Sequence, residues 1–112
     1  MKRGVLIVLM MGALVLGAGM PVWAADDDGS QVRILSPENG AVVKGNAVEV
    51  QYILVKGKQA THVHIYLDGK YQKGFSGTLK GVTPGKHEIR AVAANPDHKL
   101  FAAESVVTIT VQ

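Results

Sequence analysis

The sequence has no cysteine, and residues 25–112 have neither methionine nor tryptophan. All four methionines and the only tryptophan, Trp23, lie within residues 1–24. The rest of the chain therefore forms no disulfide bond, has no cysteine nucleophile and lacks the soft sulfur ligands that Cu(I) prefers. Any binding chemistry in this part must use oxygen and nitrogen donors, among which the four histidines are the most specific.

Residues 25–112 also have little excess of basic over acidic residues. The whole chain has a formal net charge of +3, but Lys2 and Arg3 belong to residues 1–24, which hold no acidic residue. Residues 25–112 therefore carry a net charge of only +1. Nucleic-acid binding requires a basic face on the folded domain, so a nucleic acid is not an expected partner.

Residues 1–24 have the layout of a secretory signal peptide. The basic residues Lys2 and Arg3 precede an apolar run over residues 5–16, and the small residues Val22 and Ala24 stand at the −3 and −1 positions of a cleavage site. This order of segments is typical of an export signal. We expect cleavage after Ala24 and a mature protein that is periplasmic or secreted.

An uncleaved membrane anchor is the alternative for this segment, because its charge-free stretch is just long enough to span a bilayer. Glycines and Pro21 interrupt the last third of that stretch, which then ends in the cleavage motif. These features favour cleavage, after which no membrane association is expected. No cysteine follows the apolar run, which excludes a lipid anchor.

The mature chain divides into a short leader and one domain. Residues 25–30 (ADDDGS) are acidic and polar, and they predict a flexible, solvated spacer rather than a metal-binding tail. Residues 31–112 form a single domain by their length. A chain of this size buries about 60% or slightly more of its unfolded surface, which is enough for a modest core.

After residue 30 apolar and polar residues alternate, and no helical periodicity appears. The alternating runs are residues 32–34, 48–54, 62–67, 87–93 and 100–111, with weaker strands over 71–79. Turn signals such as Asp68-Gly69 separate them. This spacing predicts a sandwich or barrel of β-strands. The residues expected between the sheets are Val50, Tyr52, Val63, Ile65, Leu67, Ile89, Ala91, Ile109 and Val111.

Four motifs resemble those of bacterial immunoglobulin-like and fibronectin type III-like domains. They are S-P-x-x-G-A-V-V (36–43), V-x-I-Y-L-D-G-K (63–70), P-G-K-H-E-I (84–89) and V-T-I-T-V (107–111). The resemblance implies an all-β fold, an antiparallel β-sandwich of about seven strands. It implies no single function, because such sandwiches have many roles.

A closer resemblance is to uncharacterised exported bacterial domains, periplasmic ones among them, whose third strand contains histidines and ends in an aspartate. Those domains also have a P-G-x-H corner and a further histidine in a late loop. The corresponding residues here are His62 and His64 followed by Asp68, then His87 at the corner and His98 in the loop. The domains of that group tend to have a longer run of histidines, whereas this chain has only H-x-H.

Three histidines and one aspartate predict a metal site. If Val63 and Ile65 face the core, His62 and His64 share the outer face of their strand, about 6.5 to 7 Å apart along it. The loop that holds Asp97 and His98 should lie at the same end of the sandwich. Imidazole and carboxylate ligands suit Cu(II) or Zn(II), with Asp97 as a fourth ligand or an orienting group.

His87 is expected to have a structural role at the opposite end. It stands two residues after Gly85 and in phase with the core residue Ile89. In immunoglobulin-like folds a tyrosine often occupies this corner and hydrogen-bonds to the backbone. A histidine ring can make the same bond, so we do not expect His87 to bind metal.

The sequence predicts a binding module rather than an enzyme. It contains no nucleophile elbow, phosphate-binding loop or paired carboxylates. The leading interpretation is a periplasmic accessory module that binds a divalent metal, although the same histidines can also be ordinary surface residues. The alternative is a metal-free structural or interaction module that binds a protein or glycan through a sheet face, such as one bearing Tyr66, Tyr71 and Phe75, or through an open edge strand.

Overall fold

A computed structural model describes residues 25–112, and all of their regular secondary structure is β-strand. The predicted signal peptide, residues 1–24, lies outside the described residues. No helix that is long and apolar enough to cross a membrane occurs in the described part of the chain.

The alternating runs form the strands that the sequence predicts. The strands of residues 25–112 are β3 (Gln31–Ser36), β4 (Val42–Val43), β5 (Val48–Glu49), β6 (Gln51–Val55), β7 (His62–Leu67), β8 (Lys70–Tyr71), β9 (Thr78–Leu79), β10 (Gly85–Ala94) and β11 (Leu100–Val111). The predicted strand over 48–54 is divided at Val50, because β5 pairs with β9 whereas β6 pairs with β3. This division and the two-residue strands explain why the segments outnumber the seven expected.

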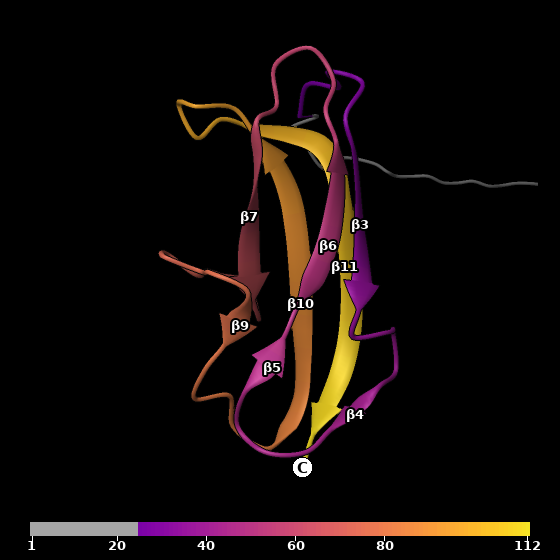
Figure 1. Ribbon diagram of the computed structural model, residues 1–112, viewed down its shortest axis with the longest axis vertical. Coiled ribbons are helices and arrows are strands. Elements are labelled where there is room, and N and C mark those ends of the chain that lie inside the picture. Colours follow the sequence, from indigo (N-terminus) through magenta and orange to yellow (C-terminus); the bar gives the residue numbers. More distant parts are fainter. Residues whose placement is uncertain (1–24) are drawn as a thin grey trace, which may run out of the picture.

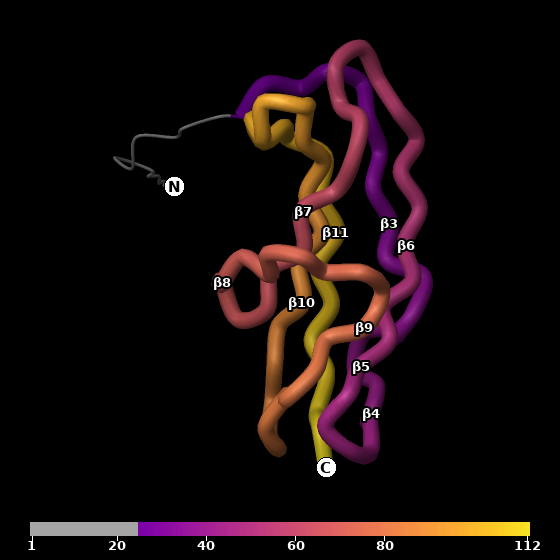
Figure 2. The backbone as a smooth tube through the Cα atoms, turned by 60° about the vertical axis from the view of Figure 1, so that its left-hand side comes forward, coloured from indigo at the N-terminus to yellow at the C-terminus, as the bar shows by residue number. Residues whose placement is uncertain are grey.

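Two layers of strands face each other. One is a five-stranded sheet in the order β4-β11-β10-β7-β8, and the other consists of the pairs β3-β6 and β5-β9. All these pairings are antiparallel except that of β4 with β11. Figure 2 shows β3 and β6 side by side and separate from β7 and β10. The arrangement is the predicted β-sandwich.

The core lies between the layers and confirms the predicted strand register. Ile65 is 1% exposed and Ile89 is fully buried, which places the odd-numbered residues of β7 and β10 against the opposite layer. The buried cluster comprises Ile34, Val48, Val50, Ile65, Leu79, Val82, Ile89, Ala91, Val107, Ile109 and Val111, with Tyr52, Val63 and Leu67 packed against it. All the core residues predicted from the sequence are in this assembly.

A second, smaller cluster closes the sandwich at the end where β7 begins. It consists of Ala60, Ala93 and the fully buried Phe101. The pairing of β10 with β11 shifts register between Val92 and Ala94, and Figure 1 shows β11 curving across this end of the molecule. The irregularity turns the start of β11 over the core and supports the loop that precedes it.

The acidic leader is packed on the domain, contrary to the expectation of a solvated spacer. Residues 25–27 are exposed, but Asp28 and Ser30 are buried. The Asp28 carboxylate accepts hydrogen bonds from the backbone N–H groups of Gln59 (3.0 Å) and Ala60 (2.8 Å). Burial alone would raise the pKa of Asp28, but hydrogen bonds from Ser30, Ala60 and Gln59 outweigh it and hold the pKa below its ordinary value.

Gly57 makes this packing sterically feasible. A Cβ atom at Gly57 would lie 2.1 Å from the Asp28 carbonyl oxygen. The Gly57 N–H donates to the Ser30 hydroxyl (2.9 Å), and the Lys58 N–H donates to the Asp28 carbonyl. The leader thereby fixes the loop between β6 and β7, and this loop leads directly to His62.

Candidate metal centre

The pairing of β7 with β10 places two histidines on one face. His62 lies opposite Ala94 and His64 opposite Val92, on the face of the five-stranded sheet that is turned away from Ile65 and the core. Since alternate residues of a strand point the same way, both rings project from this face.

His64 lies on the outer face as predicted, but it is not an ordinary surface residue. Its side chain is buried, with 6% exposure. The hairpin register pairs Tyr71 of β8 with Tyr66, and the Tyr71 ring stacks on the His64 ring at 4.6 Å between centroids and 28° between planes. His64 is therefore covered by the hairpin on one side and by its two histidine neighbours on the other.

A tight turn between β10 and β11 delivers the third histidine. The Asn95 side-chain oxygen accepts hydrogen bonds from the N–H groups of Asp97 (3.0 Å) and Lys99 (2.9 Å), and the His98 N–H donates to the Asn95 carbonyl. His98 has a φ of 66°, a left-handed conformation that histidine tolerates better than most residues. Figure 1 shows this loop and the start of β7 at the same end of the molecule.

The three rings converge on one point. The Nε2 atom of His64 lies 3.1 Å from Nε2 of His62 and 3.2 Å from Nδ1 of His98. One ligand nitrogen from each ring lies within 4.8 Å of the others. Two nitrogens bound at about 2.0–2.1 Å to one ion, with about 100° between the bonds, would be about 3.1 Å apart. The two short separations have the size that a shared ion requires.

The number of protons on the three imidazole rings also favours a cation at this point. Each neutral imidazole has one N–H and one nitrogen lone pair, so the Nε2 atom of His64 makes one well-directed hydrogen bond. It nevertheless faces two ring nitrogens at nearly equal distance. One proton cannot serve both contacts equally well, whereas a metal ion accepts lone pairs from all three rings.

The surroundings keep His64 in the form that binds metal. Burial lowers the pKa of His64, and charge on the neighbouring His62 and His98 rings lowers it further. Nδ1 of His62 lies 3.0 Å from the Thr61 hydroxyl. A hydrogen bond from Nδ1–H to that hydroxyl leaves the Nε2 lone pair free and orients the ring, as supporting groups do around metal-bound histidines.

Asp97, a predicted ligand, and His87, which was expected to have a structural role, both lie outside this group. Asp97 is exposed and does not belong to the set of converging ligand atoms, so the turn that presents His98 does not bring in the carboxylate that the sequence also offered. His87 lies at the other end of β10, where its Nδ1 is 2.6 Å from Asp68 Oδ2 and its Nε2 is 2.6 Å from the Thr83 carbonyl oxygen. This is the corner position that the sequence predicted for it.

Sequence reasoning did not assign Thr61 and Tyr71 to the site. Tyr71 was considered only as part of an exposed aromatic surface. The Asp68-Gly69 turn contained a usable signal, because a two-residue hairpin pairs Leu67 with Lys70 and Tyr66 with Tyr71. That register places Tyr71 on the same face as His64.

Comparison with known proteins supports the fold. No protein-family model and no curated protein matches the chain. Fibronectin(III)-like modules of Clostridium thermocellum CbhA are similar in structure, with 24% identity and a TM-score of 0.57 over 72% of this chain and 94% of the module. The PKD domain of human KIAA0319 has 12% identity and a TM-score of 0.46, over 85% of this chain and 90% of that domain. The first likeness confirms an immunoglobulin-like β-sandwich.

Proposed function

We propose that this protein is an exported, non-enzymatic binding module that holds one Cu(II) or Zn(II) ion through His62, His64 and His98. The observation that carries the proposal is the convergence of three ring nitrogens, two of them 3.1 Å and 3.2 Å from the third. A strand supplies two of the ligands and a hydrogen-bonded turn supplies the third, so the site is largely preformed.

The donor set restricts the metal. Imidazole nitrogens suit Cu(II) and Zn(II), whereas Ca²⁺ and Mg²⁺ take oxygen ligands. Cu(I) sites generally include sulfur ligands, which residues 25–112 do not contain. Asp97 is not part of the proposed set, because its side chain lies outside the converging group.

Metal binding is tested on purified, tag-free protein by elemental analysis and by calorimetric titration with Cu(II) and with Zn(II). We expect one ion per chain in the wild type and a large loss of affinity in the His62→Ala/His64→Ala double variant. His98→Asn is a milder change, because asparagine also tolerates the left-handed backbone of position 98. His87→Ala is the matched control and should keep the metal affinity. Equal binding by the double variant would refute the proposal.

Export is the second part of the proposal, and it rests on the layout of residues 1–24. The protein recovered from outside the cytoplasm should have the mass of residues 25–112. Its fluorescence should come from tyrosine alone, because Trp23 is the only tryptophan. An intact mass that retains residues 1–24 in that fraction would contradict cleavage.

A metal-free interaction module is the second candidate, and one surface favours it. Ile53 and Val55, two alternate residues of β6 that line one surface hollow, are 45% and 53% exposed. Exposed apolar side chains that adjoin one another can mark a binding surface for another protein. If no metal binds, Ile53→Lys should abolish association with a partner protein while the His62→Ala/His64→Ala variant retains it.

A further inference from the structure

The proposed metal position borders a surface cavity. The cavity has a volume of about 420 Å³ and is lined by His64, Tyr66, Tyr71, Lys73, His98 and Leu100. Two of the three histidines therefore form its wall. Ligand sites for small molecules typically begin at about 300 Å³, so the space suffices for a small organic ligand next to the ion.

The coordination shell leaves a place for such a ligand. The converging group supplies three nitrogen ligands, whereas Zn(II) takes four or five and its fourth position goes to water or an exogenous molecule when the protein provides only three. His64 is covered by Tyr71 and the neighbouring rings. One open side is the cavity wall shared by His64 and His98. Another cavity, of about 310 Å³, adjoins all three histidines, but neither a lysine nor an arginine lines it.

The charge of the site selects an anion. Three neutral imidazoles leave the double positive charge of the ion uncompensated. No carboxylate lines the cavity, but Lys73 does, and Lys73 has no ion-pair partner among residues 25–112. A bound metal is often the largest local charge and dominates the field of its site, so an incoming ligand that carries negative charge is favoured.

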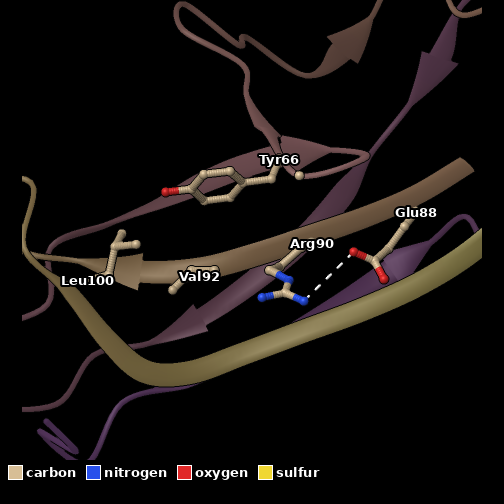
Figure 3. A pocket seen from close by; sticks show the side chains of 6 residues that line it. Tyr66, Glu88, Arg90, Val92 and Leu100 are labelled. Atoms are coloured by element: carbon tan, nitrogen blue, oxygen red, sulfur yellow. Dashed lines mark ion pairs between the residues drawn. The ribbon is translucent and has the colours of Figure 1, made fainter. Parts of the chain in front are cut away.

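A neighbouring cavity extends the space along the sheet. It has a volume of about 280 Å³ and shares Tyr66 and Leu100 with the first. Figure 3 shows the Tyr66 ring lying along the sheet with its hydroxyl directed towards Leu100, and Val92 below it. Arg90 also faces this second cavity, but Glu88 (3.7 Å) and Glu104 (3.5 Å) pair with it. Lys73, the cation without an ion-pair partner among residues 25–112, therefore lies beside the proposed metal position. The side chains of Tyr66 and Leu100 continue the wall from there into the second cavity.

We propose that the open position of the metal takes an external carboxylate, which Lys73 attracts while Tyr66 and Leu100 contact the organic part of the ligand. This inference rests on the proposed metal site and deepens it. A carboxylate fits better than a phosphate, because the cavity offers one ammonium and two phenol groups rather than a cluster of cationic donors. It is a ligand that both Cu(II) and Zn(II) accept.

The test titrates Cu(II)-loaded protein with benzoate, acetate and inorganic phosphate, and follows the visible and electron paramagnetic resonance spectra of the bound ion. We expect a saturable change with benzoate, a weaker response to acetate, which lacks the apolar body, and the weakest response to phosphate. The metal-to-protein ratio, measured after each titration, must stay constant.

Lys73 provides the decisive variants. Lys73→Ala should weaken benzoate binding roughly two- to fivefold, the range expected for one exposed charge pair, without lowering Cu(II) affinity. Lys73→Arg should retain benzoate binding. Lys44→Ala is the matched control, because Lys44 follows β4 and does not line either cavity.

The outcomes separate the two proposals. Failure of the wild type to bind Cu(II) would refute both the metal site and this inference. Normal Cu(II) binding with no spectral response to benzoate would overturn only the carboxylate site. An unchanged benzoate affinity in Lys73→Ala, or tighter binding of phosphate than of benzoate, would also overturn it.

Discussion

At the scale of single residues, the fold gives two histidines opposite environments. Burial and the nearby His62 and His98 rings lower the pKa of His64. The hydrogen bond to the Asp68 carboxylate raises the pKa of His87, and the Thr83 carbonyl adds to the effect against a smaller opposing effect of burial. The lowered pKa favours the neutral form of His64, which is the form that binds metal, and the raised pKa favours the charged form of His87, which pairs with Asp68.

The Asp68–His87 pair predicts a specific dependence of stability on pH. Because the pKa of His87 is raised in the folded protein, the pair stabilises fully below 6.5, the ordinary histidine value, and the contribution disappears as pH rises through the higher folded value. Burial would raise the pKa of Asp68, but hydrogen bonds from His87 and Glu88 outweigh it and lower the pKa. The stability that depends on the Asp68 carboxylate is therefore lost only at acidic pH, below about 3.8.

His64 has the opposite effect to His87. Its pKa is lowered in the folded protein, so its contribution makes stability rise with pH below 6.5.

Urea denaturation at pH 6.5 and at pH 9 measures the effect of the Asp68–His87 pair. The wild type should lose unfolding free energy between the two values, and His87→Gln should lose less, because glutamine does not titrate. Asp68→Asn is the matched variant and should reduce the slope in the same way. A slope in His87→Gln equal to that of the wild type would show that another group causes the pH dependence.

Asp28 gives a second prediction at this scale. Asp28→Asn should lower the melting temperature, because it removes a carboxylate that accepts two backbone hydrogen bonds from the loop before β7. Asp27→Asn is the control, since Asp27 is exposed and accepts only a local bond from Gly29. Thermal unfolding near pH 7 compares the two variants. Equal melting temperatures would mean that the leader does not stabilise the domain.

The residues of the site were predictable to different degrees. Two features of the sequence are enough to place His62, His64 and His98 together. One is the alternation in β7, and the other is that the loop with His98 lies at the same end of the sandwich as the start of β7. The burial of His64 depends on the hairpin register that brings Tyr71 over it, which the strand pattern of β7 alone does not contain. The exclusion of Asp97 depends on the backbone conformation of one turn, and neighbouring residues in a turn direct their side chains differently.

At the scale of the elements, the long strands were predictable because each buries one face against the opposite layer. The short strands could not be predicted, because they are defined only by their hydrogen-bonded pairing with another strand. The chain switches from β9 to β3 as its partner near Val50, whose N–H donates to the Gly77 carbonyl. Local alternation runs through this point without interruption, so only the tertiary pairing divides β5 from β6.

The register of β7 predicts the cost of a core substitution. Ile65 is 1% exposed at the centre of the main cluster, so Ile65→Ala should reduce the unfolding free energy by about 2–5 kcal/mol through lost burial and a residual cavity. Ile53→Ala is the control, because Ile53 is 45% exposed on β6. Urea denaturation measures both. Similar costs for the two variants would contradict the placement of Ile65 in the core.

At the scale of the whole molecule, the two ends of β7 hold separate groups of interacting side chains. His62 begins the strand beside the turn that carries His98, and Asp68 follows its end beside His87. No side chain belongs to both sets of contacts. Substitutions of the three converging histidines should therefore leave the Asp68–His87 corner intact.

This separation allows metal binding to be read from the stability of the whole domain. An ion that binds only the folded state stabilises it by about 2.7 kcal/mol when free metal is a hundredfold above the dissociation constant. For a domain of this size each kcal/mol raises the melting temperature by about 4–8 °C, so Cu(II) or Zn(II) should shift the wild type by roughly 10 °C or more. His98→Asn should show a much smaller shift at the same metal concentration, whereas His87→Gln should start from a lower melting temperature and shift as far as the wild type. A metal-induced shift that survives in His98→Asn would place the ion elsewhere on the protein.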